Sequence, residues 1–222
     1  MNSNTKRKIA EDYTLIATCY HEASHAISAL LVCSRVNYID VIPKKESYGE
    51  ISVDDIIYFY GKKSFSKELT LKVIKNRINM FYAGLIGETI YYKSICGSKK
   101  LPIYFKKSSS DDLSEITKLF NSNSIVKAGK ERFEYKKLIE KNVENTLMKY
   151  WEDIKLLAIY AYKYKKINYK KIKKLLMNNS KNKNIWIDKF SKIEKLYSDK
   201  IILKASKIEA ILFSDTLFNS SF

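Results

Sequence analysis

Two histidines one helical turn apart are the feature that most restricts how this chain folds. His21 and His25 frame the segment His-Glu-Ala-Ser-His, and the chain contains no other histidine. An α-helix advances 3.6 residues per turn, so residues four apart lie on the same face. Apolar residues recur around this segment at intervals of three and four, which predicts an amphipathic helix from about Glu11 to Cys33. One face of this helix packs against the protein while the other presents both imidazoles.

The spacing of these histidines is typical of a zinc site. Two imidazoles on one helical turn can reach the same tetrahedral Zn²⁺ ion. Glu22 lies about 100° around the helix from His21, which places it beside the ion and not among its ligands. From there its carboxylate can take a proton from a water molecule at the metal, as a general base does in a metallopeptidase. The alternative is a pair of surface histidines on an amphipathic helix. The helical context favours the metal site.

A third metal ligand must come from another residue type. A catalytic zinc site takes three protein ligands and leaves one position open. With no histidine left, an acidic residue is expected, and Asp112 and Glu88 are the candidates. Asp112 falls in the first turn of a predicted helix, where an acid also interacts favourably with the helix dipole. Glu88 falls in helical register among apolar residues, where it could instead orient a histidine through its other ring nitrogen. Spacing alone does not choose between them.

Composition and pattern predict a mainly α fold. A hydrophobic content of 45% in 222 residues supports a real core, and the low counts of glycine (6) and proline (2) favour long helices. Alternation and β-branched residues predict two short strands, at residues 35–43 and 51–53. Helical periodicity predicts helices near residues 66–92, 108–120, 134–165 and 172–177. We expect one domain at residues 1–177 and a basic, helical C-terminal appendage at 178–222, which begins with an asparagine-rich linker.

Charge and cysteine content bear on partners and location. A net charge of +17 would attract nucleic acid, an anionic membrane surface or an acidic substrate. The lysines are spread along the chain and arginines are few, which favours a compositional origin and makes a nucleic-acid partner the weaker interpretation. Three cysteines, Cys19, Cys33 and Cys96, form no disulfide framework, so we expect a reduced, cytoplasmic protein. We expect neither a signal peptide nor a transmembrane helix.

Four segments together resemble the peptidase domain of FtsH-type AAA zinc metalloproteases. Residues 17–26, Ala-Thr-Cys-Tyr-His-Glu-Ala-Ser-His-Ala, resemble that family's zinc helix, with Ser24 where a glycine is usual. Residues 36–53 resemble the strand segment that follows it. Residues 83–88, Ala-Gly-Leu-Ile-Gly-Glu, resemble the family's Gly-Gly-x-x-Ala-Glu helix, and residues 109–117 resemble its Asp-Leu-x-x-Ala-Thr segment.

The resemblance implies roles for individual residues. On this match Asp112 is the third zinc ligand, Glu88 is a supporting residue and Glu22 is the general base. The implied fold is a helical zinc-peptidase domain with a small β element beside the active-site helix. The resemblance also implies a homo-oligomer, hexameric in that family.

The chain departs from the family in lacking any Gly-x-x-x-x-Gly-Lys-Ser/Thr motif, so we expect no ATPase within it. The function that follows is a zinc metalloendopeptidase that hydrolyses flexible or unfolded polypeptides, either unaided or fed by a separate ATPase partner. The alternative function is a non-catalytic module in which the metal staples the fold and the surface binds a protein or nucleic-acid partner. The presence of Glu22 argues against this alternative, because a structural metal site needs ligands but no base.

Overall fold

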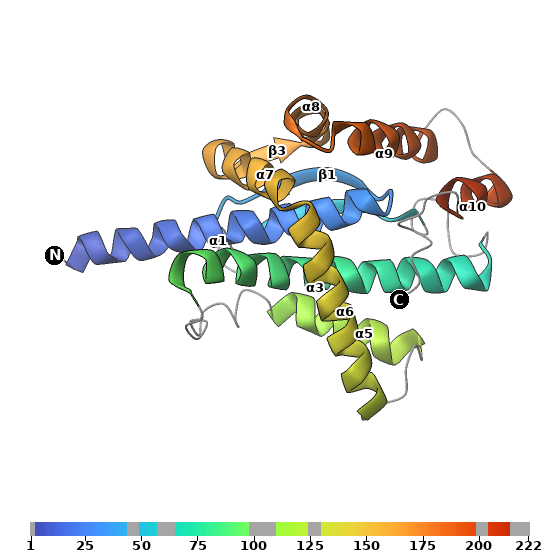
Figure 1. The fold of residues 1–222 in the computed structure, drawn as a ribbon, viewed down its shortest axis with the longest axis horizontal. Helices are drawn as coiled ribbons and strands as arrows, with labels where there is room; N and C mark the ends of the chain where they lie inside the picture. The colour runs from blue at the N-terminus through green and yellow to red at the C-terminus, as the bar shows by residue number, and fades with distance from the viewer. Residues whose placement is uncertain are drawn as a thin grey trace.

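A long N-terminal helix, a small sheet and a series of further helices make up the fold (Figure 1). The computed structural model describes residues 3–43, 49–56, 65–97, 110–123, 130–198 and 204–213. The helices are α1 (Ser3–Leu31), α3 (Lys67–Cys96), α5 (Ser110–Asn123), α6 (Lys130–Lys149), α7 (Trp151–Tyr164), α8 (Tyr169–Asn179), α9 (Lys183–Leu196) and α10 (Ala205–Phe213). The strands are β1 (Arg35–Asp40), β2 (Glu50–Asp54) and β3 (Lys166–Asn168). The expected mainly α fold with a small β element is confirmed.

Helix α1 is the element on which the others pack. Its apolar side is buried against α3 and α7, and includes Ala23, Ala26, Ile27 and Leu30. The helix ends where Cys33 takes a left-handed conformation with φ of 59°, which turns the chain toward β1. The amide of Cys33 donates to the carbonyl of Leu30 at 3.1 Å, and the Lys189 ammonium of α9 donates to the carbonyl of Leu31. These bonds satisfy carbonyl groups that a helix end leaves without partners.

The strands form one antiparallel sheet in the order β2-β1-β3, packed along α1. Ile39 of β1 pairs with Ile51 of β2 on one side and with Ile167 of β3 on the other. Strand β2 is therefore an edge strand of the described sheet. The sequence predicted β1 and β2 but not β3, because three residues are too short to show a periodic pattern.

The helices also differ from expectation in one place. The single helix predicted from residue 134 to residue 165 is wrong, because α6 and α7 are separate and meet at Tyr150. Tyr150 leaves helical geometry at φ −108° and ψ 20° while its ring is buried against Trp186 of α9. Apolar periodicity continues through this break, and no glycine or proline marks it, so the pattern alone could not show it. The bend lets α6 cross α3 while α7 lies along α1 (Figure 1).

The C-terminal elements share the core of the rest of the chain. Trp186 and Phe190 of α9 are fully buried, and the Trp186 indole donates to the Asp153 carboxylate of α7 at 3.0 Å. Residues 178–184, predicted as a linker, form the end of α8 and a tight turn into α9. The domain boundary after residue 177 stays a prediction, but the described part of 178–222 packs on the same core.

Two further expectations concern cysteines and membrane spans. Cys19 of α1 and Cys33, just beyond the end of that helix, are both buried, and neither forms a disulfide with a described residue. The Cys96 side chain and the predicted helix start at Ser108 and Ser109 lie outside the described residues. Among the helices that the structure describes, none combines the length and apolar character needed to cross a bilayer.

Candidate metal centre

Helix α1 brings two imidazole nitrogens together inside the protein. His21 and His25 lie one turn apart, and their Nε2 atoms are 3.0 Å from each other. The two rings meet edge to face, with centroids 4.6 Å apart. Both residues are buried, at 7% and 3% exposure. The predicted arrangement of two histidines on one helical face is therefore present, although that face is covered rather than open to solvent.

Asp112, in the first turn of α5, completes a cluster with these histidines. Its Oδ2 atom lies 3.0 Å from Nε2 of His21 and 3.2 Å from Nε2 of His25. This oxygen is inaccessible to solvent and receives no conventional hydrogen bond from a described group. His21, His25 and Asp112 are a group whose ligand atoms all lie within 4.8 Å of one another and could hold a metal ion.

The hydrogen bonds on the far side of each ring determine what the cluster offers. Nδ1 of His25 lies 2.6 Å from the carbonyl oxygen of Met80, and Nδ1 of His21 lies 3.1 Å from Oε2 of Glu88. A carbonyl and a carboxylate can only accept, so both Nδ1 atoms carry the hydrogen. A neutral ring then has its lone pair on Nε2. In this state three acceptor atoms converge at 3.0 to 3.2 Å, an arrangement that a metal ion or a bound proton would relieve.

The spacing of the three atoms fits a small metal ion. Zinc–ligand distances of about 2.0–2.2 Å imply tetrahedral ligands about 3.3–3.6 Å apart, a few tenths of an ångström more than the separations seen here. Gly84 of α3 supplies the room: a Cβ atom there would lie 2.7 Å from Nε2 of His21 and closer still to Nε2 of His25. A glycine within a helix allows close approach of a neighbouring helix, but the sequence does not show that the approaching atoms are the ligand nitrogens.

The two acidic candidates lie on opposite sides of His21. Glu88 is 2% exposed and bonds Nδ1, the ring nitrogen that faces away from the cluster. This geometry fits the supporting role, in which a carboxylate fixes the tautomer and orientation of a histidine. The oxygen next to both Nε2 atoms belongs to Asp112.

The electrostatic environment favours positive charge at the cluster. Burial lowers the pKa of His21, but the adjacent carboxylates of Asp112 and Glu88 outweigh burial and leave that pKa well above the usual value. For Asp112, burial raises the pKa, but the charge of His25 and the contacts with both histidines lower it overall. The site is therefore built to hold a cation next to an ionised carboxylate.

Glu22 follows His21 on α1 and is 6% exposed. It makes no hydrogen bond or ion pair with any other residue that the structure describes. Burial raises its pKa, although the neighbouring His21 and His25 act in the opposite direction. A buried carboxylate without a donor is costly for a fold, and such groups are concentrated at functional sites. Its environment is therefore that of a group able to exchange a proton.

Two glycines missed as site residues leave room around α1. Gly49, expected only as a turn, precedes β2 and lies against Glu22: a Cβ atom there would be 2.8 Å from Oε1. Ser24 stands at the position where the peptidase family that the chain resembles has glycine. It is fully buried, and its hydroxyl donates a hydrogen bond to the carbonyl of Tyr20 at 2.7 Å. A Cβ atom at Gly87 would collide with that hydroxyl. Gly87 thus accommodates the serine, and no alternating or helical pattern could have indicated this pairing.

No protein-family model matches the chain, and no curated protein matches it.

Proposed function

We propose that this protein is a zinc-dependent metalloendopeptidase, with His21, His25 and Asp112 as metal ligands and Glu22 as the general base. The observation that carries the proposal is the convergence of three buried acceptor atoms beside a buried carboxylate that has no described hydrogen-bonding partner. A structural metal site would account for the ligands. It would not account for Glu22, a buried carboxylate whose pKa burial raises and which has no hydrogen bond to the other residues that the structure describes.

The donor set supports zinc as the metal. Two imidazole nitrogens and one carboxylate oxygen, with a fourth position left for water or substrate, are a typical catalytic zinc set. When bound, Zn²⁺ acidifies water and polarises the carbonyl of a scissile peptide bond. Glu88 and the Met80 carbonyl hold the two rings so that both Nε2 lone pairs face the site. This orientation increases the basicity of the ligands and fixes their position.

The chain's own residues carry the proton through the reaction. Glu22 accepts a proton from the attacking water, and the water oxygen forms a bond to the peptide carbonyl carbon. The same carboxyl then donates that proton to the leaving amine as the carbon–nitrogen bond breaks. The raised pKa of Glu22 suits both steps, because a base whose pKa approaches the working pH can also return the proton.

The substrate we propose is a flexible or unfolded polypeptide. Strand β2 begins next to Gly49, beside Glu22, and is an edge strand of the described sheet. An extended segment can pair with such an edge through its backbone. The similarity to FtsH-type peptidase domains supports the same substrate class, with a separate ATPase partner and a hexameric assembly as part of the proposal. Cys19 and Cys33 are thiols that form no disulfide with a described residue, which supports a cytoplasmic, reducing location as part of the proposal.

The test is cleavage of an unstructured protein such as casein by zinc-loaded wild type, Glu22→Gln and Glu144→Gln. Glu144 is an exposed carboxylate on α6 and serves as the matched control. We expect Glu22→Gln to retain zinc and to lose at least about 100-fold in rate, as for removal of a general base, while Glu144→Gln behaves as wild type. Zinc in all three proteins with no cleavage by any of them would contradict an autonomous peptidase and support the metal-stapled interaction module.

A further inference from the structure

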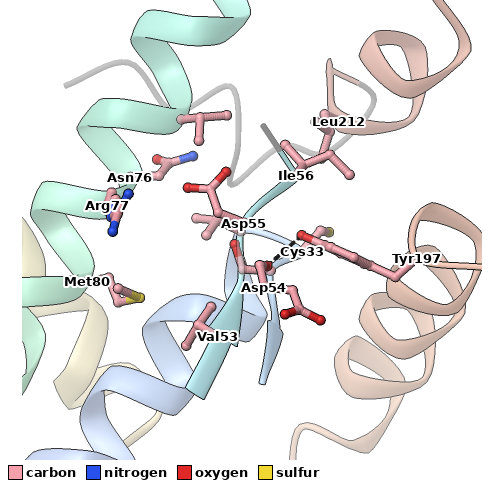
Figure 2. A pocket seen from close by; sticks show the side chains of 13 residues that line it. Cys33, Val53, Asp54, Asp55, Ile56, Asn76, Arg77, Met80, Tyr197 and Leu212 are labelled. Carbon is pink, nitrogen blue, oxygen red and sulfur yellow. Dashed lines mark hydrogen bonds between the residues drawn. The ribbon is translucent and has the colours of Figure 1, made fainter. Parts of the chain in front are cut away.

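A cavity of about 710 Å³ lies beyond the end of α1, between α3, β2, α9 and α10 (Figure 2). Its apolar walls include Val53, Ile56, Met80 and Leu212. A volume of several hundred Å³ lined by both apolar and polar side chains is within the range of ligand sites. The proposed metal ligands do not line this cavity. Met80 connects the two sites, because its carbonyl oxygen accepts a hydrogen bond from His25 and the residue also lines the cavity.

The two helices that build the metal centre also lead to the cavity. Val32, seven residues after His25 and just beyond the end of α1, lines the cavity. On α3, Gly84 and Arg77 are likewise seven residues apart on one face, and Arg77 lines the cavity. At about 1.5 Å per residue, each helix places the cavity about 10 Å from the metal ligands.

Strand β2 gives an independent estimate of the distance between the metal centre and the cavity. Gly49 lies against Glu22, and Val53, four residues further along, lines the cavity. At about 3.3 Å per residue in a strand, these positions are about 13 Å apart. A peptide lying extended beside β2, with its scissile bond at Glu22, would therefore reach the cavity with its third or fourth residue from that bond.

On the basis of the proposed function, we infer that this cavity binds a large apolar side chain of the polypeptide substrate, three or four residues from the cleaved bond. The cavity would therefore favour substrates that carry a large apolar residue at this distance from the cleaved bond. The bound side chain would replace water against the apolar walls, which is the source of the binding energy.

The charged groups at the cavity argue against a charged side chain as its occupant. The Asp54 carboxylate already forms an ion pair with Arg35 at 2.7 Å and accepts a hydrogen bond from the Asn37 amide at 2.9 Å. Asp55 and Arg77 carry opposite charges at the same cavity, as Figure 2 shows. Neither sign of charge on a ligand is therefore favoured, whereas the apolar walls favour an aliphatic or aromatic group.

Asn76 supplies a polar contact for the peptide backbone. It projects from α3 at the cavity (Figure 2), and its buried Nδ2 atom has no hydrogen-bond acceptor among the residues that the structure describes. A buried donor without a partner costs free energy that an incoming acceptor restores. A carbonyl oxygen of an extended peptide is such an acceptor. Asn76 would then fix the backbone while the neighbouring side chain enters the cavity.

The experiment uses a set of flexible peptides that differ at one position, which carries leucine, phenylalanine, glycine, aspartate or lysine. The variable position is moved from one to five residues on each side of the scissile bond. For zinc-loaded wild type we expect kcat/KM to be about tenfold higher for leucine or phenylalanine at position three or four on one side, the size of effect that an apolar pocket gives. Cleavage without an apolar preference at those positions would overturn the inference, and this scan needs no variant.

Two substitutions at Asn76 test the cavity itself. Asn76→Phe fills it and should reduce the apolar preference to less than about threefold while zinc content stays unchanged. Asn76→Ala removes the amide but leaves the space, so it should lower kcat/KM similarly for every peptide and keep the preference. An unchanged preference in a folded, zinc-containing Asn76→Phe protein would overturn the inference.

A peptide-binding measurement distinguishes failure of this inference from failure of the proposed function. Affinity of labelled peptides for zinc-loaded Glu22→Gln is measured by fluorescence anisotropy. If wild type cleaves nothing but the apolar peptides bind more tightly and Asn76→Phe abolishes that difference, the catalytic proposal fails and the cavity remains a peptide-binding site. If neither cleavage nor preferential binding of apolar peptides occurs, both fail.

Discussion

Replacing Asp112 with asparagine tests which acid completes the metal centre. The substitution keeps the shape of the side chain but removes the negative charge of an oxygen that lies 3.0 and 3.2 Å from the two Nε2 atoms. Loss of a residue that only supports a ligand weakens metal binding by about 10–100-fold. Asp112 is placed as a ligand itself, so we expect its substitution to weaken zinc binding by at least about 100-fold.

The magnitude follows from binding linkage. At a free zinc concentration of 1,000 times Kd, zinc stabilises the folded state by about 4.1 kcal/mol. A 100-fold weaker site at the same concentration is at only 10 times Kd, which leaves about 1.4 kcal/mol. For a chain of this size, about 2–4 °C accompanies each kcal/mol, so the zinc-dependent rise in Tm should fall from about 8–16 °C to about 3–6 °C.

The assay is thermal unfolding of each protein with and without buffered zinc. Asp111→Asn is the matched control, because Asp111 is the preceding residue in the same first turn of α5 and is exposed. Both substitutions lose the same interaction with the helix dipole, but only Asp112→Asn should reduce the zinc-dependent rise in Tm to about 3–6 °C or less. Glu88→Gln should keep most of it. A full shift in Asp112→Asn, together with its loss in Glu88→Gln, would refute the assignment of the third ligand.

Three further predictions concern other parts of the molecule. Gly84→Ala should leave a folded protein without zinc on elemental analysis, because the added methyl group occupies the space beside His25 Nε2; a normal zinc content would contradict this. Burial and nearby carboxylates raise the pKa of Tyr197 well above 10, so its contribution to stability is complete below pH 10 and is lost as the pH rises beyond it. Chemical denaturation should therefore show a smaller alkaline loss in Tyr197→Phe, and an equal loss would disprove it. Lys189→Met should lower the free energy of unfolding by about 1–3 kcal/mol, because the carbonyl of Leu31 loses its buried donor; no change in denaturation midpoint would show that this bond contributes nothing.

The parts of the fold that sequence could predict are those with a strong local signal. The histidine helix, β1, β2 and the start of α3 at Ser66 all follow from periodicity or capping chemistry. The Ser66 side chain accepts from the amide of Leu69, as an N-cap residue does. The break at Tyr150 was missed because it depends on packing against Trp186, a residue 36 positions away in the sequence.

The candidate metal site likewise has features that the sequence predicts and features that depend on tertiary structure. The pairing of His21 with His25 is a local property of one helix, so their spacing was sufficient to predict it. Spacing was not sufficient to choose between Asp112 and Glu88, because that choice depends on how α3 and α5 are placed around α1. The space left by Gly84 is likewise a property of the tertiary structure. A glycine in a helix indicates that a neighbouring element can approach closely, but it does not indicate which atoms of that element do so.

The central claim is that His21, His25 and Asp112 form a zinc site, and anomalous X-ray diffraction at the zinc edge tests it most directly. The measurement uses crystals of protein purified without chelator. We predict one strong anomalous peak per chain, within about 2.0–2.2 Å of both Nε2 atoms and of an Asp112 carboxylate oxygen. A peak bound elsewhere, or a well-ordered site with no peak after zinc has been supplied, would contradict the account.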